Sequence, residues 1–192
     1  PYGIKADRFA NECANPHKYS DNWYTLRNEI YKPLFQLLPA KLSPKAHIYI
    51  FCAFERFGVL YDELFNFGFY VWPYPLIWVK DAGGIPDANA GPQHNYECIL
   101  FATHGDKPCN ALYTDILQYQ IVRKKDHAAQ KPVPLLRDLL RRSAFPGAMV
   151  CDPFVGSGST LVAARLEGCV GAGFDLNPNY IELSKERVAK GE

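Results

Sequence analysis

Two glycines and one acid near the C-terminal end have types and spacing that suit hydrogen bonding to a nucleotide. Gly156 and Gly158 lie in a short turn that is followed by Ser159 and Thr160. Because glycine has no Cβ, a ligand can lie directly against this backbone, where helix-start N–H groups favour an anion. The spacing from Gly156 to Asp175 is close to the roughly 20 residues that separate such a loop from an acid that binds a ribose. The pattern predicts a nucleotide site.

Two common phosphate-binding loops do not match these residues. Leu161 stands at the third glycine position of Gly-x-Gly-x-x-Gly, and no lysine follows the glycines as in a P-loop. The plainer interpretation is a strand-to-helix turn beside a surface acid. We favour a binding site because a strand, a glycine turn, a helix and an acid-ended strand follow one another in the required order.

The elements that must position these residues can be predicted from local patterns. The apolar run at 148–151 predicts a strand, the Pro- and Gly-rich stretch at 152–158 a turn, and residues 159–166 a helix. A second apolar run at 170–174 predicts another strand, which ends at Asp175. This unit is typical of half of a nucleotide-binding sheet.

Upstream, the same reasoning predicts further elements of an α/β fold. Pro33 predicts a kink or break in the first helix, and Pro73 and Pro75 place one strand-like run near a sheet edge or a bend. The predicted helices are 23–38, 55–67, 132–143 and 179–190, the predicted strands are 47–53, 69–80 and 96–103, and 81–95 is a long loop. Residues 69–103 are expected to form an antiparallel pair.

Four motifs together resemble those of the beta-class DNA amino-methyltransferases. Residues 152–160, Asp-Pro-Phe-Val-Gly-Ser-Gly-Ser-Thr, resemble the S-adenosylmethionine motif, and residues 173–178, Gly-Phe-Asp-Leu-Asn-Pro, resemble the acidic loop that follows it. Gln-Lys-Pro at 130–132 resembles the segment that precedes the first of these motifs. Pro-Tyr-Gly at 1–3 resembles the second half of the catalytic Asp-Pro-Pro-Tyr-Gly motif. Catalytic motif first and cofactor motif last is the beta-class order.

The resemblance implies an α/β fold, namely a Rossmann-like S-adenosylmethionine-dependent methyltransferase fold. It is circularly permuted, with a mostly parallel sheet and an antiparallel edge pair. A single domain over 1–192 is expected, with a catalytic half at about 1–104, a short recognition or linker region at about 105–130 and a cofactor-binding half at about 131–192. The chain begins at Pro1 and its only Met is Met149, so we expect an upstream strand and the leading catalytic residue to be missing.

The resemblance also implies a reaction and its cofactor. The expected activity is methyl transfer from S-adenosylmethionine to the exocyclic amino group of a flipped DNA base, with adenine N6 favoured because Pro-Tyr-Gly is commonest in adenine enzymes. Cytosine N4 and an inactive S-adenosylmethionine-binding fragment are the alternatives. A nicotinamide oxidoreductase is an alternative from the fold alone, although the missing third glycine argues against it.

Site residues follow from the matched motifs. Pro1 and Tyr2 are the catalytic candidates, with Tyr2 stacking on the flipped base. The cofactor-binding candidates are Lys131, Asp152, Phe154, Gly156, Ser157, Gly158, Ser159, Thr160 and Asp175. Three of them have a structural alternative: Lys131 as a helix-start residue, Asp152 as a cap of the loop, and Phe154 as a core residue.

Composition limits the expected partners. With a formal net charge of only +1, contact with double-stranded DNA must come from local clusters such as 123–125 or 141–142. The six cysteines show no Cys-x-x-Cys pair and no Cys/His ligand spacing, so no metal is expected. No run approaches the ~20 apolar residues of a membrane span, which predicts a cytoplasmic protein, bacterial or phage-encoded. A homodimer and a partner endonuclease are both left open.

Overall fold

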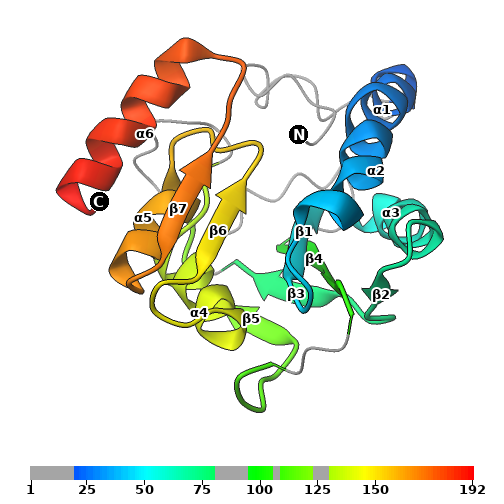
Figure 1. Cartoon of the computed structure of the whole chain (residues 1–192), viewed down its shortest axis with the longest axis horizontal. Helices are drawn as coiled ribbons and strands as arrows, with labels where there is room; N and C mark the ends of the chain where they lie inside the picture. The colour runs from blue at the N-terminus through cyan, green and yellow to red at the C-terminus, as the bar shows by residue number, and fades with distance from the viewer. Residues whose placement is uncertain (1–19, 81–94, 106–108, 123–129) are drawn as a thin grey trace, which may run out of the picture. The chain divides into compact units, whose positions relative to one another are not determined.

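The computed structural model describes residues 20–80, 95–105, 109–122 and 130–192 (Figure 1). The chain divides into two compact units, Pro1–Pro108 with Thr114–Gln118, and Cys109–Tyr113 with Tyr119–Glu192. The expected organisation as one methyltransferase domain with two halves stays a prediction. No helix among the described residues is long and apolar enough to cross a membrane.

The first unit begins with a helix that changes its winding along its length. It runs through α1 (Ser20–Leu26), a π-helical turn η3 (Arg27–Tyr31) and α2 (Lys32–Lys41). The change lies just before Pro33, at the start of α2. Since proline has no N–H, it cannot donate to the carbonyl four residues earlier, and a local π-helical turn accommodates it. The helix continues through Pro33 with this change of winding, so the predicted break does not occur.

The sheet of this unit is built around its longest strand, β4. The strands are β1 (His47–Cys52), β2 (Tyr70–Val71), β3 (Leu76–Val79), β4 (Tyr96–Thr103) and β5 (Ile116–Gln118), and α3 (Phe54–Asn66) connects β1 to β2. β4 pairs antiparallel with β1, β2 and β3, whereas β3 and β5 are parallel. The antiparallel pair expected over 69–103 is confirmed. Antiparallel pairing extends further, to β1.

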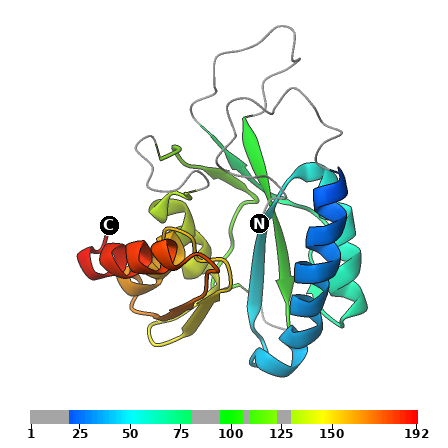
Figure 2. The ribbon, with the colours of Figure 1, turned by 90° about the horizontal axis from the view of Figure 1, so that it is seen from above.

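One face of β4 forms the core with the helices (Figure 2). Alternate residues of a strand point to the same face, and Cys98, Leu100 and Ala102 all belong to the core cluster. Leu60 of α3 and Phe35 of α2 belong to the same cluster. The three helical segments and α3 therefore bury their apolar faces against this side of the sheet.

The second unit contains the predicted nucleotide-binding half. It comprises α4 (Val133–Ser143), β6 (Met149–Asp152), α5 (Ser159–Leu166), β7 (Val170–Gly173) and α6 (Pro178–Lys190). β6 and β7 are parallel, with Met149 opposite Val170 and Asp152 opposite Gly173. The helix α5 contacts both strands and also α4 and α6 (Figure 1). The predicted α/β class is confirmed. Among the described strands, three pairings are antiparallel and two are parallel, whereas a mostly parallel sheet with an antiparallel edge pair was expected, because the long strand β4 pairs antiparallel on both sides.

Candidate cofactor-binding site

The glycine loop connects β6 to α5 through two residues with positive φ. Gly156 has φ of 49° and Gly158, the N-cap residue of α5, has φ of 83°. Side chains with a Cβ rarely adopt these conformations, so glycine is favoured at both positions by backbone geometry alone. The loop accordingly reverses direction within a few residues and enters the helix without a side-chain cap.

The loop is held along the end of β7 by main-chain hydrogen bonds. The N–H of Val155 donates to the carbonyl of Phe174 over 2.9 Å, and the N–H of Phe174 donates to the carbonyl of Asp152 over 3.0 Å. These bonds continue the β6–β7 pairing beyond the two strands. The glycine loop and the acidic loop are therefore adjacent.

Asp175 connects the two loops through its carboxylate. Its Oδ2 accepts a hydrogen bond from the N–H of Gly156 at 3.0 Å, and its Oδ1 accepts one from the N–H of Asn177 at 2.9 Å. A carboxylate offers about four acceptor sites, so these two bonds leave acceptor capacity for hydroxyl groups. The partly buried acid thus fits a ribose diol as well as the backbone it already binds.

Asp152 and Phe154 lie at the start of the loop. Asp152 Oδ1 accepts from the N–H of Phe154 at 2.9 Å, which is the local turn that aspartate side chains favour. Asp152 therefore caps the loop, and its predicted contact with the cofactor stays a prediction. The Phe154 side chain is 37% exposed, so Phe154 is not a core residue and its ring has accessible surface beside the glycines.

The hydroxyl groups of Ser157 and Ser159 are turned into the protein. Both residues are buried, and their Oγ atoms accept hydrogen bonds from Arg187 Nη1 at 3.1 and 3.2 Å. The same nitrogen donates to the carbonyl of Ser157 at 2.7 Å. Sequence reasoning predicted hydroxyls toward a ligand and did not identify Arg187. Its position in the last helix carried no motif, so no local signal pointed to it.

Two glycines of this region are also required by packing. A Cβ built on Gly158 would lie 2.7 Å from the Cβ of Ser184 in α6, and one built on Gly173 would lie 2.7 Å from Cγ2 of Val155. Real Cβ atoms do not approach so closely. Gly158 was predicted for ligand access, and the structure adds that it lets α6 pack against the loop.

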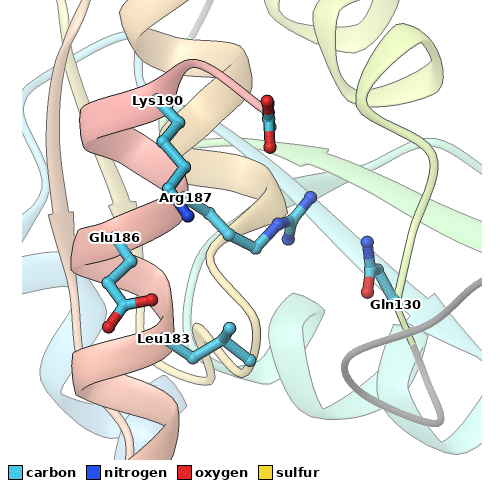
Figure 3. Close-up of a pocket in the computed structure, with 6 residues that line it drawn as sticks. Gln130, Leu183, Glu186, Arg187 and Lys190 are labelled. Carbon is cyan, nitrogen blue, oxygen red and sulfur yellow. The ribbon is translucent and has the colours of Figure 1, made fainter.

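Of the remaining predicted site residues, two are described by the structure and two are not. Thr160 is partly buried in the first turn of α5, and Lys131 is partly buried in the segment before α4. Gln130, next to Lys131, lines a cavity of about 380 Å³ (Figure 3) together with Leu183, Glu186, Arg187, Lys190 and Glu192. Pro1 and Tyr2, the catalytic candidates, lie outside the described residues.

Much of the loop's hydrogen bonding is satisfied within the chain. Besides the bonds of Phe154, Val155 and Gly156, the N–H of Gly158 donates to the carbonyl of Val155 over 2.8 Å. Of these four donors, only the N–H of Gly158, the N-cap residue of α5, belongs to the helix start that sequence analysis expected to face an anion. Their use inside the chain means that the loop has its shape before a ligand arrives, which lowers the cost of ordering it.

The basic pair at 141–142 does not form an open basic surface. Arg142 is buried and its Nη2 donates to Asp138 Oδ2 over 3.0 Å, while Arg141 Nη2 lies 2.9 Å from Glu167 Oε1. The other predicted cluster, 123–125, lies outside the described residues. Among the residues that the structure describes, no group of three His, Cys, Asp or Glu side chains could hold a metal ion.

The chain matches known proteins over most of its length. The family model for DNA methylases, N6_N4_Mtase, matches residues 1–186. The type II methyltransferase M.HpaI of Haemophilus parainfluenzae is 25% identical over 215 residues, which cover 98% of this chain. The chain spans only 65% of the length of M.HpaI.

Solved structures show the same fold. The structure titled as the M1.HpyAVI–SAM complex superposes with a TM-score of 0.70 at 24% identity, over 81% of this chain and 80% of that one. The cytosine-N4-specific PvuII DNA methyltransferase superposes with a TM-score of 0.70 at 16% identity, over 92% and 78%. At these identities the likeness shows the fold, whereas the family match covers nearly the whole chain. From that match and the loop geometry together, the chain belongs to the N6/N4 family of DNA methylases.

Proposed function

We propose that this chain binds S-adenosylmethionine at the glycine loop and methylates the exocyclic amino group of a base in double-stranded DNA, with adenine N6 as the target. The observation that carries the proposal is the Asp175 carboxylate bonded to Gly156 at the end of β6 and β7, in a chain that belongs to the DNA methylases. The SAM complex of M1.HpyAVI, which has the same fold, supports the choice of cofactor.

The residues around the loop have the chemistry to hold this cofactor. Asp175 has acceptor sites left for the ribose hydroxyls, because its bonds to the N–H groups of Gly156 and Asn177 use only part of its capacity. The exposed ring of Phe154 offers an apolar surface beside the loop, and Asp152 adds negative charge near it. We assign Lys131 and Thr160 to the same site, with Gly156 and Gly158 shaping its backbone. Ser157 and Ser159 belong to the site through the loop backbone, because their hydroxyl groups are buried and bind Arg187.

When bound, S-adenosylmethionine supplies a methyl group on a cationic sulfur, and its transfer forms an N–C bond, breaks an S–C bond and releases one proton from the nitrogen. The amine is a poor nucleophile because its lone pair is delocalised into the base. Acceptors that hold the amine hydrogens favour a pyramidal nitrogen, so positioning and electrostatics supply most of the rate. We assign this role to the segment at Pro1 and Tyr2, with Tyr2 stacking on the flipped base.

The target base is the finer part of the proposal. Adenine is supported by Pro-Tyr-Gly at 1–3, which is commonest in adenine enzymes of the resembled class. Cytosine N4 is the second candidate, because the cytosine-N4-specific PvuII enzyme has the same fold over 92% of this chain.

The test is methyl transfer from labelled S-adenosylmethionine to unmethylated double-stranded DNA, followed by nucleoside analysis. It is run on this chain and on a version that carries the upstream residues expected from the sequence. Label in N6-methyladenine supports the proposal in full. Label in N4-methylcytosine overturns the choice of adenine, and no label with either version overturns the proposed reaction.

A further inference from the structure

We propose that Arg187 is a positioning residue for the cofactor, acting only through the glycine loop. The inference rests on the proposed function and adds a residue that none of the motifs contains. Its basis is the set of contacts that the Arg187 side chain makes with Ser157 and Ser159 of the loop. Figure 3 shows this side chain extending from α6 beside the pocket.

A single nitrogen of Arg187 organises both sides of the second glycine. Nη1 lies 2.7 Å from the Ser157 carbonyl, 3.1 Å from Ser157 Oγ and 3.2 Å from Ser159 Oγ. Gly158 lies between these serines and is the N-cap residue of α5. The guanidinium group therefore holds the residues on both sides of the junction between the loop and the helix.

The position of Arg187 makes these bonds strong and specific. The residue is only 8% exposed, so water competes weakly for its N–H groups, and hydrogen bonds from a charged donor are the stronger kind. Ser184, one turn earlier on α6, packs against Gly158. α6 thus supports the loop sterically through Ser184 and electrostatically through Arg187, while Asp175 holds it from the β7 side.

The structure also provides a matched control. Arg165 in α5 donates through Nη1 to the carbonyls of Val188 and Ala189, near the end of α6. Both arginines therefore connect α6 to the region of α5, but Arg165 bonds to the end of α6 whereas Arg187 bonds to Ser157 in the loop. A variant of Arg165 loses a contact of α6 without losing a bond to the loop.

The experiment measures S-adenosylmethionine binding by calorimetry for the wild-type chain, Arg187→Met, Arg187→Lys, Ser159→Ala and Arg165→Met, each well below its Tm. For Arg187→Met we expect Kd to rise by at least about tenfold, equivalent to ~1.4 kcal/mol. Arg187→Lys keeps a donor and should recover part of the loss. Arg165→Met should stay within about twofold of wild type. The cavity beside Arg187 leaves space for the smaller side chains.

Kinetics on the active form separate positioning from general destabilisation. The KM for S-adenosylmethionine should rise in Arg187→Lys, while kcat at saturating cofactor stays at the wild-type value. Arg187→Met removes the hydrogen bond to Ser159 that Ser159→Ala also removes. The double variant should therefore bind S-adenosylmethionine no more weakly than Arg187→Met alone.

Each result decides the inference. Wild-type Kd in a folded Arg187→Met or Arg187→Lys variant overturns it, and so does an equal loss of affinity in Arg165→Met. Should Arg187→Met not fold, the Arg187→Lys and Ser159→Ala affinities decide, and both at the wild-type value refute the role. Failure of the wild-type chain to bind overturns the proposed function itself, which is a different observation.

Discussion

Replacement of Asp175 by alanine should weaken both the loop and the binding of S-adenosylmethionine. The carboxylate accepts from the N–H groups of Gly156 and Asn177 at 3.0 and 2.9 Å. A hydrogen bond to a charged group contributes about 1.5–3 kcal/mol. Because Asp175 is partly exposed, water can replace part of each bond, and we expect a loss of about 1–2 kcal/mol in the free energy of unfolding.

The loss in cofactor affinity is a separate quantity. If Asp175 accepts from the ribose hydroxyls, the variant should bind at least ~1.5 kcal/mol more weakly, which is about a tenfold rise in Kd. Calorimetry measures this Kd directly, and urea unfolding measures the stability. Glu182→Ala is the matched control, since Glu182 is an exposed acid of α6 that pairs with Lys185 on the same helix.

Two further comparisons separate the ribose from the loop. Asp175→Asn keeps one acceptor oxygen for the backbone but loses the charge, so its stability should lie between wild type and Asp175→Ala. An S-adenosylhomocysteine analogue that lacks a ribose hydroxyl should bind the wild-type chain more weakly than the parent ligand. It should bind Asp175→Ala as well as the parent ligand does. Unchanged affinity in Asp175→Ala, or equal discrimination between the ligands in both proteins, would refute the assignment.

Two other substitutions test the packing and the charges of the second unit. Gly158→Ala places a Cβ 2.7 Å from the Cβ and 2.8 Å from the Cα of Ser184, at a φ of 83°, so urea unfolding should show a loss of about 2–4 kcal/mol in the free energy of unfolding. Ser184→Gly should restore little of this loss, because the Cα of residue 184 stays in place. The hydrogen bond from Arg141 lowers the pKa of Glu167. The ionised Glu167 therefore stabilises the fold fully at a pH above the ordinary glutamate pKa of about 4.3, and this stabilisation is lost as the pH falls through the lowered pKa. Glu167→Gln should therefore lower the free energy of unfolding by less than about 1 kcal/mol at pH 7, and its Tm should decline less steeply in acid than that of the wild type. An unchanged decline of Tm in acid would show that Glu167 is not its source.

Local patterns were sufficient for elements whose signals lie within one segment. The strand Tyr96–Thr103 and the helix Ser159–Leu166 have the predicted bounds, because an apolar run and a glycine turn report backbone conformation directly. Pro33 predicted a kink or break in its own helix, and the structure has instead a π-helical turn just before it, because a change of winding accommodates the missing N–H. The pairing of β1 with β4 was not predicted, because strand direction depends on segments far apart in the chain.

The candidate site shows the same division. The sequence alone determined the glycine loop, the acid at Asp175 and the motifs that place the chain among DNA methylases, because these features depend on residue type and short spacing. Only the tertiary structure decided that Ser157 and Ser159 turn toward Arg187 and that Gly158 packs on Ser184. Those contacts join α6 to a loop about 30 residues earlier, and their formation depends on how β7 and α6 fold back, which no local pattern encodes.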